Sequence, residues 1–124
     1  MTRTLEHYLQ SCPPFDWRAF NCCHFAAGWA KLRTGKDYMA GLPETATLVD
    51  ATRLKARLGG LLAAVSARLG VPVPVAEAKI GDLVLIKADD AELLGIYTGA
   101  GVICVDQTGF VVFVMSVATH AWSL

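Results

Sequence analysis

The sequence carries little charge, and none of it is gathered into a run of one sign beyond a few residues. Eleven Lys and Arg residues balance eleven Asp and Glu residues, so the formal net charge is zero. Binding to nucleic acid without sequence preference requires positive charge that neutralises phosphates. Nucleic acid is therefore not an expected partner.

Long apolar stretches are also missing. No uninterrupted run approaches the roughly 18 residues that a membrane-spanning helix needs. The N-terminal segment lacks the apolar core of a signal peptide, because Glu6, His7 and Gln10 interrupt it. We therefore expect no membrane span and no signal peptide, and a protein that stays in the cytoplasm unless it is assembled into something that leaves.

Metal-binding spacings are absent as well. The four cysteines, Cys12, Cys22, Cys23 and Cys104, form no C-x-x-C pair, so no zinc motif is present. Cytosolic synthesis argues against structural disulfides. The thiols are expected to be free, to include one nucleophile, or to be ligands that only the fold gathers. The acidic run 89–92 lacks further ligands and is predicted to be a solvated hairpin tip.

The chain is rich in apolar residues. They make up 54% of its 124 residues, whereas 18% are charged. A length of 124 residues predicts one domain over residues 1–124. The high apolar content indicates either a well-packed, alanine-rich domain or a surface that another protein covers.

Helices are predicted in the first part of the chain. A short helix spans 4–10, and Asn21 is a suitable N-cap for a helix that Thr34 and Gly35 end. Its apolar stripe is predicted to be Cys22, Phe25, Ala26, Trp29 and Leu32. Asp50 is expected to cap a second helix, 51–58, which Gly59 and Gly60 separate from a third, 61–69.

Strands are predicted in the second part. Runs rich in β-branched residues, separated by glycine-containing turns, occupy 83–88, 93–97, 102–105 and 110–115. Strands in hairpin succession are antiparallel. The fold class is therefore α+β, with N-terminal helices packed on one face of a four-to-five-stranded antiparallel sheet.

Three segments carry a resemblance to a known enzyme family. They are Asn21-Cys22-Cys23-His24-Phe25, Ile80-Gly81-Asp82-Leu83-Val84 and Leu93-Leu94-Gly95-Ile96-Tyr97-Thr98-Gly99. In this order they resemble the NlpC-type cell-wall cysteine peptidases, which have a papain-like fold. The resemblance places Cys22 at the position of the nucleophile, Leu93 at that of the catalytic histidine and Val105 at that of the orienting residue. It also implies that Gly81-Asp82 closes a turn before a strand, in which Asp82 accepts backbone N–H groups.

A closer resemblance is to small phage and prophage proteins encoded among tail genes. Phe15, Trp17, residues 21–27, Gly81-Asp82 and Ala121-Trp122 carry it. The resemblance implies synthesis in the bacterial cytoplasm, a place in the virion tail, docking on tail-tip, hub or central tail proteins, and contact with peptidoglycan.

Leu93 stands where the resembled peptidases have their catalytic histidine, and this absence separates three hypotheses. Amide hydrolysis needs an acid that protonates the leaving amine, and Leu93 cannot transfer protons. His24 is expected to point away from Cys22, whereas His7 lies near the N-terminus and His120 in a C-terminal tail. The leading hypothesis is therefore a pseudoenzyme with an assembly role and no cofactor, in which Cys22 is a small buried hydrophobic residue. The alternatives are an active peptidoglycan endopeptidase that uses Cys22, and an iron–sulfur or metal site formed by Cys12, Cys22, Cys23 and Cys104.

Overall fold

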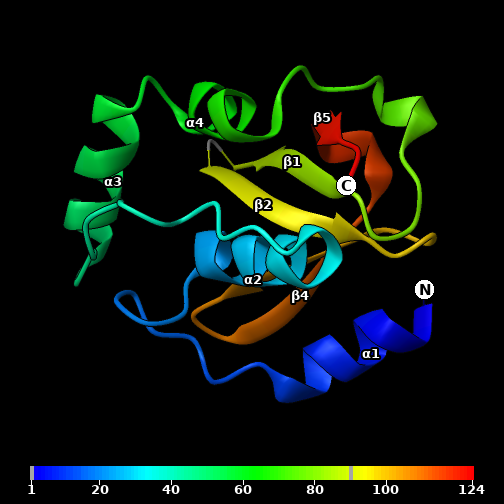
Figure 1. Ribbon diagram of the computed structural model, residues 1–124, viewed down its shortest axis with the longest axis horizontal. Helices are drawn as coiled ribbons and strands as arrows, with labels where there is room; N and C mark the ends of the chain where they lie inside the picture. The colour runs from blue at the N-terminus through cyan, green and yellow to red at the C-terminus, as the bar shows by residue number, and fades with distance from the viewer. Residues whose placement is uncertain (1, 90) are drawn as a thin grey trace.

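The computed structural model describes residues 2–89 and 91–124, and these form four α-helices and a five-stranded antiparallel sheet (Figure 1). This confirms the predicted α+β class. The helices are α1 (Thr2–Ser11), α2 (Cys22–Thr34), α3 (Leu48–Arg57) and α4 (Leu61–Leu69), and two short 3₁₀ turns span Val75–Glu77 and Met115–Val117. The strands are β1 (Leu83–Ala88), β2 (Ala91–Tyr97), β3 (Val102–Asp106), β4 (Gly109–Phe113) and β5 (Ala118–Trp122). Asp90, at the predicted acidic tip, is not among the described residues, and no helix in the described ranges is long and apolar enough to cross a membrane.

The sheet has the strand order β4-β3-β2-β1-β5. The first four strands follow one another as hairpins, as predicted. The prediction of a C-terminal tail is wrong, because residues 118–122 pair with the outer edge of β1, with Leu83 opposite Trp122 and Val84 opposite Ala121. Pairing buries Trp122 almost completely, and so the gain from burying a large aromatic side chain adds to the backbone hydrogen bonds.

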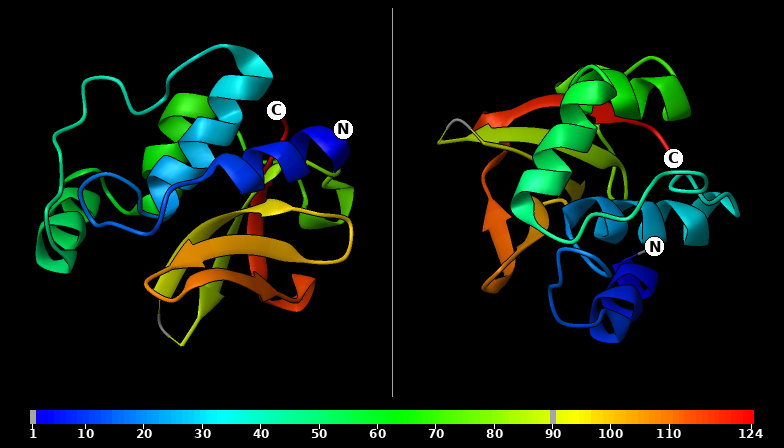
Figure 2. Two further views of the ribbon diagram at one scale, coloured as in Figure 1. Left: turned by 90° about the horizontal axis from the view of Figure 1, so that it is seen from below. Right: turned by 90° about the vertical axis from the view of Figure 1, so that its left-hand side faces the viewer.

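Two apolar cores lie on opposite faces of the sheet, since consecutive strand residues alternate between them. The larger core joins α1, α2 and α4 to one face and includes Phe25, Trp29 and Trp122. The smaller core, on the other face, includes Val84, Ile86 and Cys104. Figure 2 shows α1 and α2 together on one side of the strands, in agreement with the predicted layer of helices.

Helix α2 is fastened to the sheet by Trp29. Its indole Nε1 donates a hydrogen bond of 2.7 Å to the carbonyl oxygen of Gly81, directly before β1. The buried residues of α2 are Phe25, Ala26, Trp29 and Ala30. The predicted stripe was wrong at its last position, because Leu32 near the end of the helix is 61% exposed. The stripe turns toward Ala30, which packs in the larger core.

Helix α3 begins earlier than predicted. Thr47 is its N-cap, and the Thr47 hydroxyl accepts the Asp50 N–H at 3.2 Å. Asp50 instead lies inside the first turn, where its carboxylate accepts the Ala46 N–H and suits the positive end of the helix dipole. No residue of α3 is buried, and the helix lies beside the sheet rather than on it (Figures 1 and 2).

The Gly81-Asp82 pair shapes the entrance to β1. Gly81 has φ +95°, a conformation that favours glycine. The buried Asp82 carboxylate accepts the N–H of Lys79 at 2.8 Å and that of Leu124 at 3.3 Å. The predicted role of Asp82 as an acceptor for backbone N–H groups is confirmed.

Candidate functional site

The N-terminus of α2 is built by a reciprocal cap. The Asn21 side-chain oxygen accepts the N–H groups of Cys23 and His24, at 2.9 and 3.2 Å. In return, His24 Nδ1 accepts the Asn21 N–H at 3.2 Å. Asn21 itself is buried and donates to the carbonyl oxygen of Trp17. This arrangement makes Cys22 the first residue of the helix and holds it in place from both sides.

Cys22 is half-buried and lies where β2 and β3 separate. The two strands pair only at Ile96–Ile103 and Tyr97–Val102, so Leu94, which pairs with Leu85 of β1, has no partner residue on β3. The Leu94 N–H instead acts as a donor that favours the Cys22 thiolate. The helix N-terminus thus fills the splayed end of the β2–β3 hairpin.

The environment of Cys22 favours its thiolate. The pKa of Cys22 falls to about 7, chiefly because the Cys23 thiol donates to its sulfur, with smaller help from the Leu94 N–H and the Lys55 ammonium, and against the opposing effect of burial. A position at a helix N-terminus acts in the same direction. The pKa of Cys23 rises well above its usual range, chiefly because its thiol is the donor in the hydrogen bond to Cys22 and also because it is buried. The first proton that the pair loses therefore comes from Cys22.

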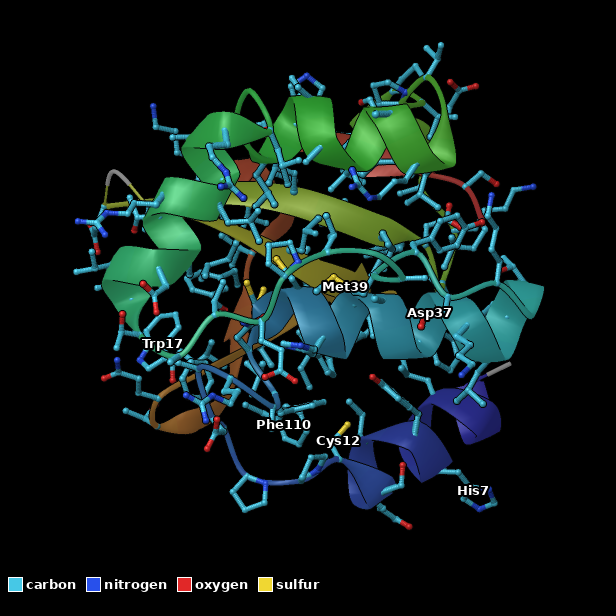
Figure 3. The ribbon with its side chains drawn as sticks, turned by 60° about the vertical axis from the view of Figure 1, so that its left-hand side comes forward. His7, Cys12, Trp17, Asp37, Met39 and Phe110 are labelled. Atoms are coloured by element: carbon cyan, nitrogen blue, oxygen red, sulfur yellow. The ribbon has the colours of Figure 1, made fainter. Side chains whose placement is uncertain are left out.

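The other two thiols are not part of this site. Cys104 lies in the smaller core on the opposite face of the sheet, and burial raises its pKa to about 12. Cys12 directly follows α1, its thiol donates to the Tyr8 carbonyl oxygen, and it lies between α1 and α2 in the view of Figure 3. Among the described residues no three His, Cys, Asp or Glu side chains are placed to hold one metal ion. The structure brings Cys22 and Cys23 together but does not gather the four-cysteine set.

The three positions singled out by the peptidase resemblance do come together. Cys22, Leu93 and Val105 line one cavity of about 370 Å³, which Phe15 and Trp17 also border. Chain separation between these positions is large, so the tertiary fold creates the arrangement. Val105 packs in the larger core, as Cys22 does, whereas the Leu93 side chain packs against the smaller core on the opposite face of the sheet.

None of the three histidines is hydrogen-bonded to Cys22. His24 uses Nδ1 in the helix cap, and burial lowers its pKa, so the ring there is neutral. His120 lies on β5, where it contacts Thr119 and stacks on Trp122. His7 is exposed on α1 and points away from α2 (Figure 3). His24 and Cys22 border the same cavity, and the capping role of His24 was not foreseen from the sequence.

A second cavity, of about 330 Å³, also borders Cys22 and shares Trp17, Leu48 and Leu93 with the first. It lies between α2, α3, α4 and the segment 38–45, and Cys22, Cys23 and Lys55 line one part of it. Sequence reasoning missed both Lys55 and the Leu94 N–H. Lysine on an exposed helix carries no signal of its own, and a free N–H in a strand can be recognised only from the pairing of that strand.

The pKa values predict which thiol reacts first with an alkylating reagent. With iodoacetamide at pH 7 to 8, we expect one fast modification, at Cys22, because the pKa values of Cys12, Cys23 and Cys104 are all raised. The thiolate is the nucleophile, so the rate should rise with pH through a midpoint near 7 and then level off. Mass spectrometry of quenched samples measures this profile.

Two variants serve as controls for this profile. Cys22→Ser should lose the fast phase, and Cys23→Ala should move the midpoint upward, because the main hydrogen bond to the Cys22 sulfur disappears. A wild-type profile with its midpoint near that of an ordinary thiol, about 8.5, would contradict the assignment.

Comparison with known protein families gives one match. The model of a domain of unknown function, DUF6950, matches residues 1–124. No curated protein and no solved structure matches the chain.

Proposed function

The chain belongs to the DUF6950 family, and we propose that it is an assembly protein of a phage tail tip, built on a degenerate cysteine-peptidase site. The observation that carries this proposal is the cavity shared by Cys22, Leu93 and Val105. It has the nucleophile of a papain-like peptidase and aliphatic side chains at the two positions that would supply the proton-transfer chemistry.

The proposed inability of this site to hydrolyse peptides follows from what the leaving group of an amide requires. A departing amine must be protonated, and a nearby imidazole usually supplies that proton. His24, the histidine nearest to Cys22 in the sequence, has its Nδ1 committed to the N-cap. The Lys55 ammonium favours the Cys22 thiolate through its positive charge.

Docking on another protein is supported by the outer strand β4. It forms one edge of the sheet, and Phe110, Val112 and Val114 along it are 45%, 67% and 65% exposed. Residues 109–115 contain no proline and no charge, the devices that usually protect an edge from pairing. We propose that this edge receives a strand of a neighbouring tail-tip or hub protein.

Particle assembly tests the proposal. In the phage or prophage that encodes the chain, Val112→Lys should reduce the amount of this protein in purified particles at least tenfold. A lysine placed in an apolar strand-to-strand contact loses hydration without gaining a partner, and each 1.4 kcal/mol is worth a factor of ten. Quantitative mass spectrometry of the particles measures the effect.

Two matched variants define the outcome. Ala67→Lys adds the same charge at an exposed position of α4 and should assemble normally, and so should Cys22→Ala. The peptidase alternative is tested with purified peptidoglycan, from which the wild-type protein should release no new amino termini. Release that disappears in Cys22→Ala would replace the assembly proposal with an endopeptidase.

A further inference from the structure

The apolar cavity beside Cys22 is a cleft that is open to solvent. Its volume of about 330 Å³ lies within the range that small-molecule sites occupy. Much of its wall is aliphatic or thioether in character, from side chains of the segment 38–45, α3 and α4: Met39, Leu42, Leu54, Leu58, Leu61 and Leu69. Such a wall suits a flexible hydrocarbon group rather than a polar ligand.

Helix α3 contributes apolar side chains to the wall of this cavity. None of its residues is buried, and Leu48, Ala51, Leu54 and the C-cap Leu58 all line the cavity. These side chains are exposed or only partly covered by protein atoms. An apolar occupant would bury them and hold α3 against the body of the domain.

Cys22 borders this cavity and also the cavity of about 370 Å³ that Leu93 and Val105 line. Cys23 and Lys55 line the first of these cavities, Val105 lines the second, and Trp17, Leu48 and Leu93 line both. The two adjoining cavities leave space beside Cys22 for an acyl group and for a departing group. It also has a cation and a backbone N–H nearby, from Lys55 and Leu94.

The missing proton donor restricts the chemistry of this thiol to one class of acyl donor. An amide needs its leaving amine protonated, but a thioester releases a thiolate, which departs without a proton. A site with an activated thiol and no acid can therefore accept an acyl group from a thioester although it cannot cleave a peptide.

We propose that Cys22 is an acyl-acceptor site, which takes an aliphatic acyl group from an acyl thioester and holds the chain in the apolar cavity. The Cys22 thiolate attacks the thioester carbonyl carbon, a new S–C bond forms at Cys22, and the original S–C bond breaks. The donor leaves as a thiolate, so atoms, electrons and charge balance without a further reactant. No imidazole is bonded to Cys22 to activate water against the new thioester, so the modification persists. This inference goes beyond the assembly role and does not depend on it.

Aliphatic thioesters of N-acetylcysteamine, from butanoyl to dodecanoyl, test the proposal on the full chain. Intact mass spectrometry should find one adduct per chain, sensitive to hydroxylamine and absent in Cys22→Ser, whereas Cys12→Ser should react as the wild type does. The rate should rise by up to about fourfold for each added CH₂, because burying one is worth about 0.8 kcal/mol, and should level off once the cavity is full. Equal acylation of Cys12, or a rate independent of chain length, would overturn the proposal.

A cavity-filling variant separates the role of the cavity from that of the thiol. Ala51→Phe places a ring in the cavity from α3, where no residue is buried, so the fold should tolerate it. We expect the longest acyl chains to react at least tenfold more slowly, with the iodoacetamide rate unchanged as proof that the thiol and the fold are intact. Unchanged rates with long chains would show that the cavity does not hold the acyl group.

Discussion

Replacing Gly95 with alanine is expected to destabilise the protein by about 3 kcal/mol or more, the upper end of the cost of overpacking a core. A Cβ at this position would lie 2.5 Å from the Cys104 sulfur, 2.5 Å from the Ile103 carbonyl oxygen and 2.6 Å from Val102 Cγ1. The carbonyl oxygen belongs to the backbone of β3 and cannot rotate away. The strands β2 and β3 must therefore separate at the only two residue pairs that join them. Urea denaturation followed by tryptophan fluorescence measures the change.

Two comparisons show that the cost is steric. Gly35→Ala meets no atom within 4 Å, but Gly35 has φ +79°, so it should cost only about 1 kcal/mol, from backbone conformation. The double variant Gly95→Ala with Cys104→Ala removes the sulfur but leaves the Ile103 oxygen, and it should remain strongly destabilised. Full rescue by Cys104→Ala would show that the backbone contact is unimportant.

Replacing Trp29 with alanine should cost about 3–5 kcal/mol, a large share of the roughly 5–15 kcal/mol that stabilises a domain. Trp29 is fully buried, contacts Tyr8 and hydrogen-bonds to the Gly81 carbonyl oxygen. It therefore joins α1, α2 and the start of β1 at one point. A lower urea midpoint with an unchanged slope would show that stability, and not the compactness of the unfolded chain, has changed.

Trp29→Phe divides this loss into two parts. Phenylalanine keeps most of the apolar volume but cannot donate to the Gly81 oxygen, which is left buried without that partner, at a cost of about 1–3 kcal/mol. We expect Trp29→Phe to lie between the wild type and Trp29→Ala. If Trp29→Phe were as stable as the wild type, the hydrogen bond to Gly81 would contribute nothing measurable.

Much of the fold could be predicted from local patterns in the sequence. The Asn21 cap, the Gly35 terminus and the Gly59-Gly60 break bound their helices because each effect acts within one turn of the chain. The first four strands follow from short β-rich runs and glycine turns, and hairpin connection then makes them antiparallel. The position of Asp82 as an acceptor for backbone N–H groups also followed from its turn. All of these depend on residues close in sequence.

The errors arose where distant segments compete. Residues 118–122 resemble a tail until the free edge of β1 is known, and pairing there depends on a strand more than 30 residues away. Leu32 has the spacing of a buried residue, but burial depends on what covers that end of α2. Thr47 and Asp50 are both suitable N-caps for α3. Because Thr47 is the N-cap in the structure, Leu48 and Val49 belong to the helix.

For the site, the sequence by itself determined the residue types: a thiol at a helix N-terminus, with leucine and valine where proton-transfer groups would be needed. Only the tertiary structure decided that Cys22, Leu93 and Val105 border one cavity, with Cys22 and Val105 packed on the larger core and Leu93 and Cys104 on the smaller core across the sheet. The physical reason is that strand residues alternate between faces, whereas an unpaired N–H and an unfilled cavity exist only where separate elements end or diverge. The thiolate-favouring environment of Cys22 comes from such a divergence, at the splayed end of β2 and β3.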